Sequence, residues 1–209
     1  MKTKTRLCKI CRTRFEVKSN THWYCDFDCA MEGLKKEKEK KAKSIQRNKR
    51  TTHSHLYIKE NKADLQTTIN HIARLIDKDC RCIDCDRTEA KPCWDGGHFK
   101  SRGSTPSLRY NLHNIFKQTR YCNSKSEGNK EDYDKGLKDM YGEDYYVYVV
   151  SLEKKYNVLH LPHNEIPEAL KSARKILREL KKLDQSYTPE HRIRLRTEYN
   201  KRIGIYKKD

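Results

Sequence analysis

Long hydrophobic runs are missing from this sequence. No apolar stretch approaches the roughly 20 residues that a membrane-spanning helix requires, and no apolar segment of a secretory signal follows the N-terminus. Hydrophobic residues make up only 34% of the 209 residues, so the chain has too few of them for a large core. We therefore expect a soluble protein that is not secreted and that acts in the cytoplasm.

Negative charge is also scarce. The chain has 47 Lys and Arg against 29 Asp and Glu, which gives a formal net charge of +18 and a pI near 9.5. A net charge of this size indicates an anionic partner, either a nucleic acid or an anionic membrane surface. Because no membrane-spanning segment accompanies the charge, the composition favours nucleic acid and no membrane.

The nine cysteines are expected to bind metal, because a protein without a secretory signal stays where thiols are kept reduced. The first four form the pattern Cys8-x2-Cys11, thirteen residues, then Cys25-x3-Cys29, which is the spacing of a four-thiolate zinc site. So few large apolar residues surround them that folding needs metal-binding free energy, on the order of 10 kcal/mol. His22 as a ligand and four unrelated buried thiols are the alternatives. Such knuckles bind DNA, RNA and protein alike, so the motif does not fix the function.

Composition changes along the chain predict four regions. Residues 1–32 form the zinc-binding module. Residues 33–53 form a basic helical linker, a solvated helix or flexible tether that lies along a phosphate backbone, with a purely solubilising linker as the alternative. Residues 54–130 hold a cysteine-rich core preceded by an amphipathic helix, which the apolar spacing places over 56–78. Residues 131–209 form a basic helical region.

The C-terminal region carries clear helix boundaries. The helical pattern breaks near Gly142, and an amphipathic helix begins near Pro167. Thr188 as N-cap and Pro189 at the first helical position start the last helix. Arginines interleaved with tyrosines suit backbone contacts and stacking on unpaired bases, with an ordinary charged helix face as the alternative. The arginines expected to contact DNA are Arg174, Arg178, Arg192, Arg194, Arg196 and Arg202.

The middle of the chain carries a pattern that points to catalysis. His98 follows two glycines, and the pair Cys82-x2-Cys85 stands upstream. Asn114 and Asn123 follow downstream. An imidazole can take a proton from water near neutral pH, a hard cation can neutralise charge on a phosphate, and an amide can hold that cation or brace the loop. This is the spacing of a ββα-metal nuclease, in which two strands precede a helix.

The two glycines before the histidine, Gly96 and Gly97, need an explanation, since glycine is costly to order in a strand. We expect them to end the strand in a tight turn that places His98 beside a phosphate without an intervening Cβ. A loop with a chance histidine is the alternative.

Several stretches of the sequence resemble a known family. The box "DGGH" is similar to the Asp-Arg-Gly-His box of the ββα nonspecific nucleases, and His98, Asn114 and Asn123 follow the HNH pattern in its His-Asn-Asn form. Along essentially the whole chain, "CKICRTRF", "SNTHWYC", "CIDC", "GGHFKSRG", "LRYNLHNIFKQTRYCN" and "SEGN" resemble the phage NinG (Rap) recombination endonucleases. The resemblance implies an endonuclease that cleaves branched DNA, such as Holliday junctions and D-loops, in the cytoplasm of the host bacterium.

The resemblance also implies roles for single residues. His98 is the general base, Asn123 a ligand of a catalytic Mg²⁺ or Mn²⁺ ion, and Asn114 the brace of the loop. Lys100 and Arg102 are expected to touch the scissile phosphate. The alternatives that stay open are Asn129 for the metal shell, Asn111 for the brace and His113 as a catalyst.

Two positions depart from the pattern of the superfamily. Many HNH enzymes place Asp directly before the base, where this chain has Gly97, so we expect mostly water around the catalytic ion besides Asn123. The usual second zinc site takes a Cys-x2-Cys pair around the second strand, where this chain has Thr119. We therefore predict a second structural zinc held by Cys82, Cys85, Cys93 and Cys122. Cys80 in place of Cys93, or packed thiols without an ion, are the alternatives.

The leading hypothesis is an α+β protein with a small ββα-metal (HNH-type) nuclease core, zinc-binding cysteines, flanking helices and an N-terminal zinc knuckle or ribbon. A noncatalytic zinc-stabilised nucleic-acid-binding protein and an HNH nuclease that reads sequence are the alternatives. Because a four-way junction has two-fold symmetry, a homodimer is a further expectation, with the amphipathic helix over 167–183 as its candidate surface.

Overall fold

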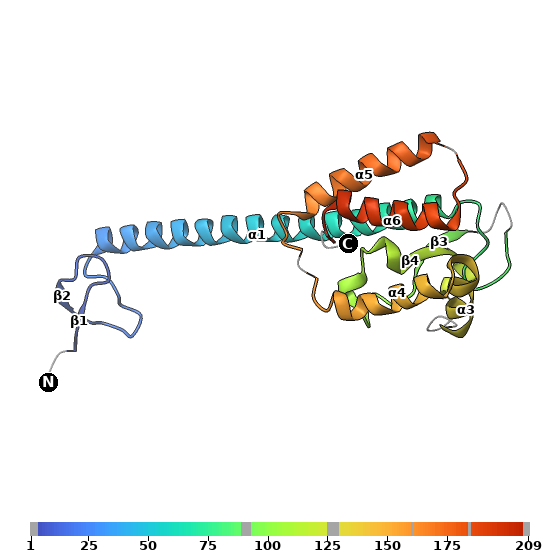
Figure 1. Cartoon of the computed structure of the whole chain (residues 1–209). Helices are drawn as coiled ribbons and strands as arrows, with labels where there is room; N and C mark the ends of the chain where they lie inside the picture. The colour runs from blue at the N-terminus through green and yellow to red at the C-terminus, as the bar shows by residue number, and fades with distance from the viewer. Residues whose placement is uncertain (1–3, 89–92, 125–129, 160, 184, 207–209) are drawn as a thin grey trace. The chain divides into compact units, whose positions relative to one another are not determined.

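A computed structural model describes residues 4–88, 93–124, 130–159, 161–183 and 185–206 (Figure 1). The chain divides into two compact units, residues 1–57 and 58–209. Helices form most of the described chain, and two small antiparallel sheets accompany them. The predicted α+β class is confirmed at this level. Every helix in the described ranges is too polar or too short to cross a bilayer.

The first unit is built on one short hairpin. Strands β1 (Thr5–Leu7) and β2 (Arg14–Glu16) pair antiparallel, with Arg6 opposite Phe15. The Trp23 ring is exposed and packs against two cations, since the Arg6 guanidinium lies 3.8 Å and the Lys9 ammonium 4.0 Å from its centre. So small an apolar interior leaves the fold of this unit dependent on its cysteines.

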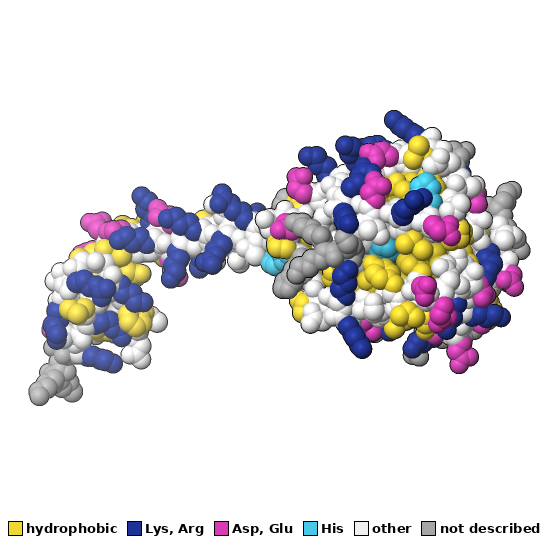
Figure 2. All heavy atoms as spheres, in the orientation of Figure 1, with side chains coloured by type: hydrophobic (Ala, Val, Ile, Leu, Met, Phe, Trp, Pro, Cys, Tyr) yellow, Lys and Arg dark blue, Asp and Glu magenta, His cyan; other side chains and the backbone are white. Residues whose placement is uncertain are grey.

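Helix α1 runs from Phe27 to Ile76 without a break, where the sequence predicted a basic linker and then a separate helix. Neither Gly nor Pro occurs over residues 34–76, and Lys and Glu dominate the first half, so nothing in the sequence ends the helix. Residues 34–51 are all exposed, and Figure 2 shows Lys and Arg side chains along this stretch. The linker is therefore a solvated helix and not a flexible tether.

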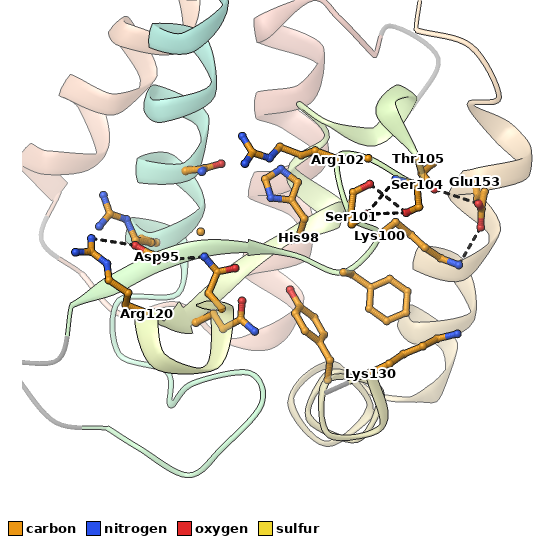
Figure 3. Close-up of a pocket in the computed structure, with 18 of the residues that line it drawn as sticks. Asp95, His98, Lys100, Ser101, Arg102, Ser104, Thr105, Arg120, Lys130 and Glu153 are labelled. Carbon is orange, nitrogen blue, oxygen red and sulfur yellow. Dashed lines mark hydrogen bonds and ion pairs between the residues drawn. The ribbon is translucent and has the colours of Figure 1, made fainter. Parts of the chain in front are cut away.

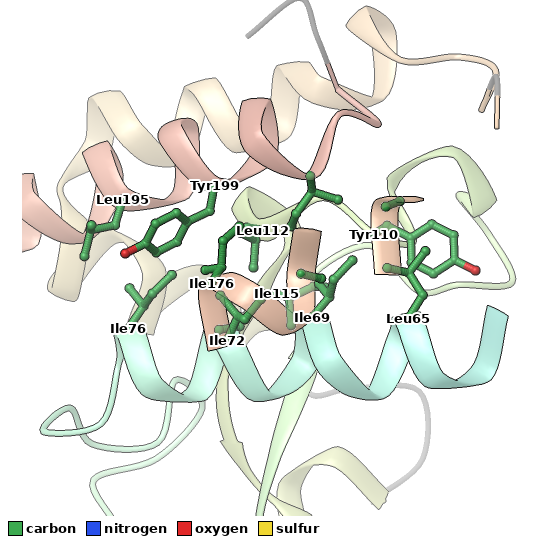
Figure 4. Close-up of a cluster of buried hydrophobic side chains, with 14 of the residues drawn as sticks. Leu65, Ile69, Ile72, Ile76, Tyr110, Leu112, Ile115, Ile176, Leu195 and Tyr199 are labelled. Atoms are coloured by element: carbon green, nitrogen blue, oxygen red, sulfur yellow. The ribbon is translucent and has the colours of Figure 1, made fainter. Parts of the chain in front are cut away.

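The main core of the second unit lies between α1, α5 (Ile166–Leu183) and α6 (Pro189–Ile203) (Figure 4). The predicted cap of α6 is present, since Thr188 Oγ1 accepts a hydrogen bond from His191 N at 3.3 Å. The apolar face of α5 is buried in this core, so it is not available as the expected dimer surface. The buried side chains include Leu65, Ile69, Ile72, Ile76, Leu112, Ile115, Ile176, Leu195 and Tyr199.

A two-stranded sheet and a short helix form the part of this unit that carries His98. Strands β3 (Trp94–His98) and β4 (Ile115–Thr119) pair antiparallel, and α2 (Arg120–Ser124) follows directly. Between the strands lie the 3-10 helices η1 (Pro106–Leu108) and η2 (Leu112–Asn114).

Two further helices cover a second apolar cluster around Phe116. They are α3 (Lys130–Tyr141) and α4 (Glu143–Lys155), and they are separated at Gly142 as the sequence predicted. Gly142 has φ of 87°, a conformation that suits glycine and ends α3.

The paired glycines lie inside β3, so the expected tight turn is wrong. A Cβ on Gly96 would come within 2.8 Å of Asn70 Cβ on α1. A Cβ on Gly97 would overlap the side chain of Gln118 on β4. The glycines therefore let β3 pack closely against both neighbours, which brings the end of the strand and His98 next to α1.

Candidate active site and metal-binding clusters

One pocket of about 1110 Å³ gathers predicted site residues from several elements (Figure 3). His98 at the end of β3, Asn123 of α2, and Lys100 and Arg102 of the following loop all line it. Helix α1 contributes Asn70 and Arg74, and α4 contributes Glu153. The structure thus brings together four residues that the sequence singled out.

The hydrogen bonding of His98 determines which ring nitrogen carries the proton. Nε2 lies 3.0 Å from the carbonyl oxygen of Arg109. A carbonyl can only accept, so Nε2 carries the hydrogen and Nδ1 keeps its lone pair. Burial, helped by the charges of Arg102 and Arg109 and opposed by the Arg109 carbonyl, lowers the pKa of His98 to about 4. The imidazole is therefore neutral at pH 7 and able to accept a proton at Nδ1.

Side chains of α1 hold Arg109, whose carbonyl contacts His98. Gln66 Oε1 accepts a hydrogen bond from Arg109 Nε at 2.9 Å, and the Gln66 amide donates to Asn70 Oδ1 at 2.8 Å. The same amide nitrogen lies 3.4 Å from His98 Nε2. The carbonyl that orients the imidazole thus belongs to a residue whose side chain is tied to α1.

Asp95 lines the pocket beside Asn123, although no role was predicted for it from the sequence. Asn123 Nδ2 donates to Asp95 Oδ2 at 3.1 Å, and the Arg120 guanidinium lies 3.4 Å from Asp95 Oδ1. A carboxylate and an amide oxygen are donor types that hard divalent cations take. The box "DGGH" begins and ends with residues of the site, because Asp95 and His98 both line the pocket.

Asn114 lies behind the pocket and clamps the loop. Its Oδ1 accepts from Lys100 N at 2.8 Å, and its Nδ2 donates to Lys100 O at 3.0 Å. The alternatives lie elsewhere: Asn111 caps η2 by accepting from His113 N at 2.9 Å, and His113 is buried against Tyr145. Asn129 lies outside the described residues.

Three basic side chains that were not predicted from the sequence also line the pocket. They are Arg74 of α1, Arg120 of α2 and Lys130 of α3. Arg120 directly follows β4, so its position beside the site could have been inferred from the predicted strand and helix. Arg74 and Lys130 lie far from His98 in sequence, and no local pattern connects them to it. Together with Lys100 and Arg102, they make the pocket strongly basic.

The N-terminal cysteines come together as predicted. The sulfur atoms of Cys8, Cys11, Cys25 and Cys29 lie within 4.8 Å of one another and can hold one metal ion. Burial raises the pKa of Cys8, but backbone N–H groups, Ile10 first, outweigh it and lower that pKa to about 6. N–H groups directed at sulfur stabilise a thiolate, which suits a zinc ligand. His22 is not part of this group.

The second cysteine group has three members among the described residues, namely Cys82, Cys85 and Cys122. Cys93 lies outside it, so the expected fourth position is wrong. The Cys93 carbonyl accepts from Arg120 N at 2.8 Å, which extends the β3–β4 ladder and fixes this exposed residue away from the three thiols. The alternative ligand Cys80 also lies outside the group, and burial raises its pKa to about 11.

None of the six C-terminal arginines expected to bind DNA lines the pocket. Arg196 is fully buried, with its guanidinium 2.7 Å from Asp77 Oδ2, so the expected phosphate contact is wrong for it. Arg192 is 11% exposed and donates to Tyr187 O, which excludes most of its surface from DNA as well. The remaining four are surface residues, Arg174 paired with Asp64, Arg202 paired with Glu179 and Glu198, and Arg178 and Arg194 exposed.

Comparison with known proteins identifies relatives of this chain. A family model described as "Bacteriophage Lambda NinG protein" matches residues 1–184. "Protein ninG" of Escherichia phage 933W is 30% identical over 159 residues, which cover 66% of this chain and 77% of that protein. The protein of that name from Escherichia phage lambda is 30% identical over 150 residues (61% and 71%), and that from Salmonella phage P22 is 31% identical over 154 residues (63% and 73%). No solved structure matches the chain.

Proposed function

The chain belongs to the phage NinG family, and from this premise we propose that it is a metal-dependent HNH-type endonuclease that cleaves branched DNA, such as Holliday junctions and D-loops. The observation that carries the proposal is a neutral His98 with a free lone pair at Nδ1, placed in a basic pocket beside Asp95 and Asn123. These are the parts that hydrolysis of a phosphodiester requires.

His98 is the general base of the proposed reaction. Its Nδ1 removes a proton from a water molecule, and the oxygen of that water forms a bond to phosphorus while the bond from phosphorus to the leaving sugar oxygen breaks. A proton from solvent water completes the leaving hydroxyl group. The Arg109 carbonyl keeps the hydrogen on Nε2 and holds the positive imidazole that results. Arg102 lines the same pocket and would contact the phosphate, while Asn114 keeps the loop after His98 in place.

Asp95 and Asn123 fit a divalent cation, because both line the pocket, their side chains are in contact, and together they supply a carboxylate and an amide group. A bound Mg²⁺ or Mn²⁺ ion supplies positive charge that offsets the charge developing on the phosphate and on the leaving oxygen. Asp95 adds a protein ligand to a site for which the sequence predicted Asn123 and water.

The order of elements supports the HNH class. His98 ends β3, Asn114 directly precedes β4, and Asn123 lies on α2. This is the strand–strand–helix order of a ββα-metal site. Two structural zinc ions, one at each cysteine group, complete the proposed cofactors.

DNA as the substrate is supported by charge. The net charge of +18 and the exposed basic stretch over residues 34–50 of α1 suit phosphate contacts along duplex arms. The preference for branched DNA rests on the family resemblance.

The test is cleavage of a labelled four-way junction and its matched linear duplex in Mg²⁺ or Mn²⁺, with wild type and His98→Ala. We expect wild type to cut the junction preferentially and His98→Ala to bind it without cutting. Binding without metal-dependent cleavage by either protein would favour the noncatalytic alternative. Cleavage of linear duplexes at one defined sequence would favour the sequence-reading nuclease.

A further inference from the structure

We propose that Lys100, Thr105 and Lys130 form a second phosphate-binding subsite beside His98, and that Glu153 occupies it in the free protein in place of a DNA phosphate. The inference rests on the proposed function in taking DNA as the ligand. It adds a subsite for a phosphate other than the scissile one, and an acidic residue that competes with DNA for it.

The contacts of Glu153 are those of a bound phosphate (Figure 3). Its Oε2 lies 2.9 Å from Lys100 Nζ, and its Oε1 accepts a hydrogen bond from Thr105 Oγ1 at 3.1 Å. An ammonium and a hydroxyl group are donors that a phosphate oxygen accepts from equally well. Lys130 adds a second basic group to the same side of the pocket. The Glu153 side chain is 47% exposed, so an incoming strand can displace it.

The donors of the subsite are held in place. The Asn114 amide clamps the main chain of Lys100 on both sides. Ser101 fixes the rest of the loop, since its Oγ accepts from Ser104 N at 3.0 Å and its carbonyl accepts from Thr105 N at 2.9 Å. Because Lys100 follows His98 by two residues, a strand with one phosphate at His98 would bring a neighbouring phosphate to these donors.

Glu153 carries a negative charge at neutral pH, because the hydrogen bonds from Lys100 and Thr105 lower its pKa. A fixed anion in a phosphate subsite weakens DNA binding until it is displaced. Substrates that depend on this subsite then lose more affinity than substrates that can bind through other contacts, which raises selectivity for DNA that engages the protein at several points.

If Glu153 only anchored the loop, its substitution would change DNA affinity in the opposite direction. If Glu153 only ties residues 100–105 to α4, then loss of its charge loosens the loop and weakens DNA binding. The substitution Glu153→Gln separates the two, because it removes the charge and keeps the shape and an acceptor for Thr105.

The experiment measures the affinity of zinc-loaded His98→Ala protein for a fluorescent linear duplex and a four-way junction over a range of salt concentrations. We expect Glu153→Gln to tighten duplex binding about fivefold and junction binding less. The slope of log affinity against log salt should steepen by about one, because Lys100 becomes free to neutralise another phosphate. Adding Lys100→Met should remove the gain.

Glu168→Gln on α5 is the matched control, since it changes the net charge equally at an exposed position outside the pocket. Equal or weaker duplex binding by Glu153→Gln, or an equal gain in Glu168→Gln, would overturn the subsite. The affinity measurement needs no cleavage. Unchanged affinity together with an active wild type therefore rejects the subsite alone, and tighter binding together with an inactive wild type rejects the nuclease alone.

Discussion

The carbonyl oxygen of Arg109 lies 3.0 Å from His98 Nε2, and this contact decides which ring nitrogen can accept a proton. Arg109 is in turn held by Gln66 of α1. A long helix that looks like a separate element in sequence thus helps to set the tautomer of the proposed base. The following predictions test this arrangement and its surroundings.

His98 should titrate far below an ordinary histidine. Its pKa is lowered from 6.5 to about 4, mainly by burial, so the folded protein keeps it neutral where the unfolded chain takes up a proton. The stability that it contributes is complete above pH 6.5 and is lost as the pH falls from 6.5 through about 4. Long-range ¹H–¹⁵N NMR should give the midpoint, and His98→Gln should show a shallower loss of stability over this range. A midpoint near 6.5 would contradict the burial of the ring.

Asp95 and Asn123 should be needed for cleavage and not for binding. We expect Asp95→Ala and Asn123→Ala each to lower the rate of junction cleavage about 100-fold and to raise the Mn²⁺ concentration required. Junction affinity should not fall, because neither residue is basic. Asp64→Ala, which removes an exposed carboxylate on α1, is the control. Full activity of Asp95→Ala would show that Asp95 is no ligand.

Arg196 should matter for stability. Arg196→Met removes the shorter of the two ionic contacts of buried Asp77 and leaves it with Arg192 at 3.9 Å and the hydrogen bond from Tyr141 at 2.6 Å. We expect a loss of about 3–5 kcal/mol in the free energy of unfolding, measured by urea denaturation. Arg194→Met on the exposed side of the same helix should cost less than about 0.5 kcal/mol. Similar effects of the two changes would mean that the buried pair is not formed.

The glycines of β3 should differ in their tolerance of alanine. Gly96→Ala meets the backbone and Cβ of Asn70, so we expect it to cost about 1–3 kcal/mol in the free energy of unfolding. Gly97→Ala meets the flexible Gln118 side chain, so Gln118→Ala should relieve it. Denaturation of the single and double variants provides the measurement. Failure of Gln118→Ala to rescue Gly97→Ala would argue against the overlap.

Metal content should separate the cysteines into two groups. We expect two zinc ions per chain by elemental analysis, one of which is lost in Cys11→Ser and the other in Cys122→Ser. Cys93→Ser and Cys80→Ser should both retain two, because neither thiol lies in a group. Loss of one zinc in Cys93→Ser would restore Cys93 as the fourth ligand.

Local signals in the sequence determined much of this protein. The Thr188 cap and the break at Gly142 were predicted because each depends on residues within one turn of the chain. The spacing of cysteines predicted the first group and the Cys82–Cys85 pair of the second for the same reason, since two or three residues between thiols form a turn, whereas Cys122 was predicted from the family resemblance. The position of His98 at the end of a strand was also readable from its neighbours.

Only the tertiary structure decided which charged groups face the pocket. Arg194 and Arg196 look alike in sequence, yet Arg194 is exposed and Arg196 is buried against Asp77. These two partners lie 119 residues apart in the sequence. The pairing of Asp95 with Asn123 depends on the register of β3 with β4, and Arg74 reaches the site because β3 packs on α1. Composition and spacing fix the kinds of side chain available. Long-range packing selects which of them meet, because burial of a charge depends on partners that local sequence does not contain.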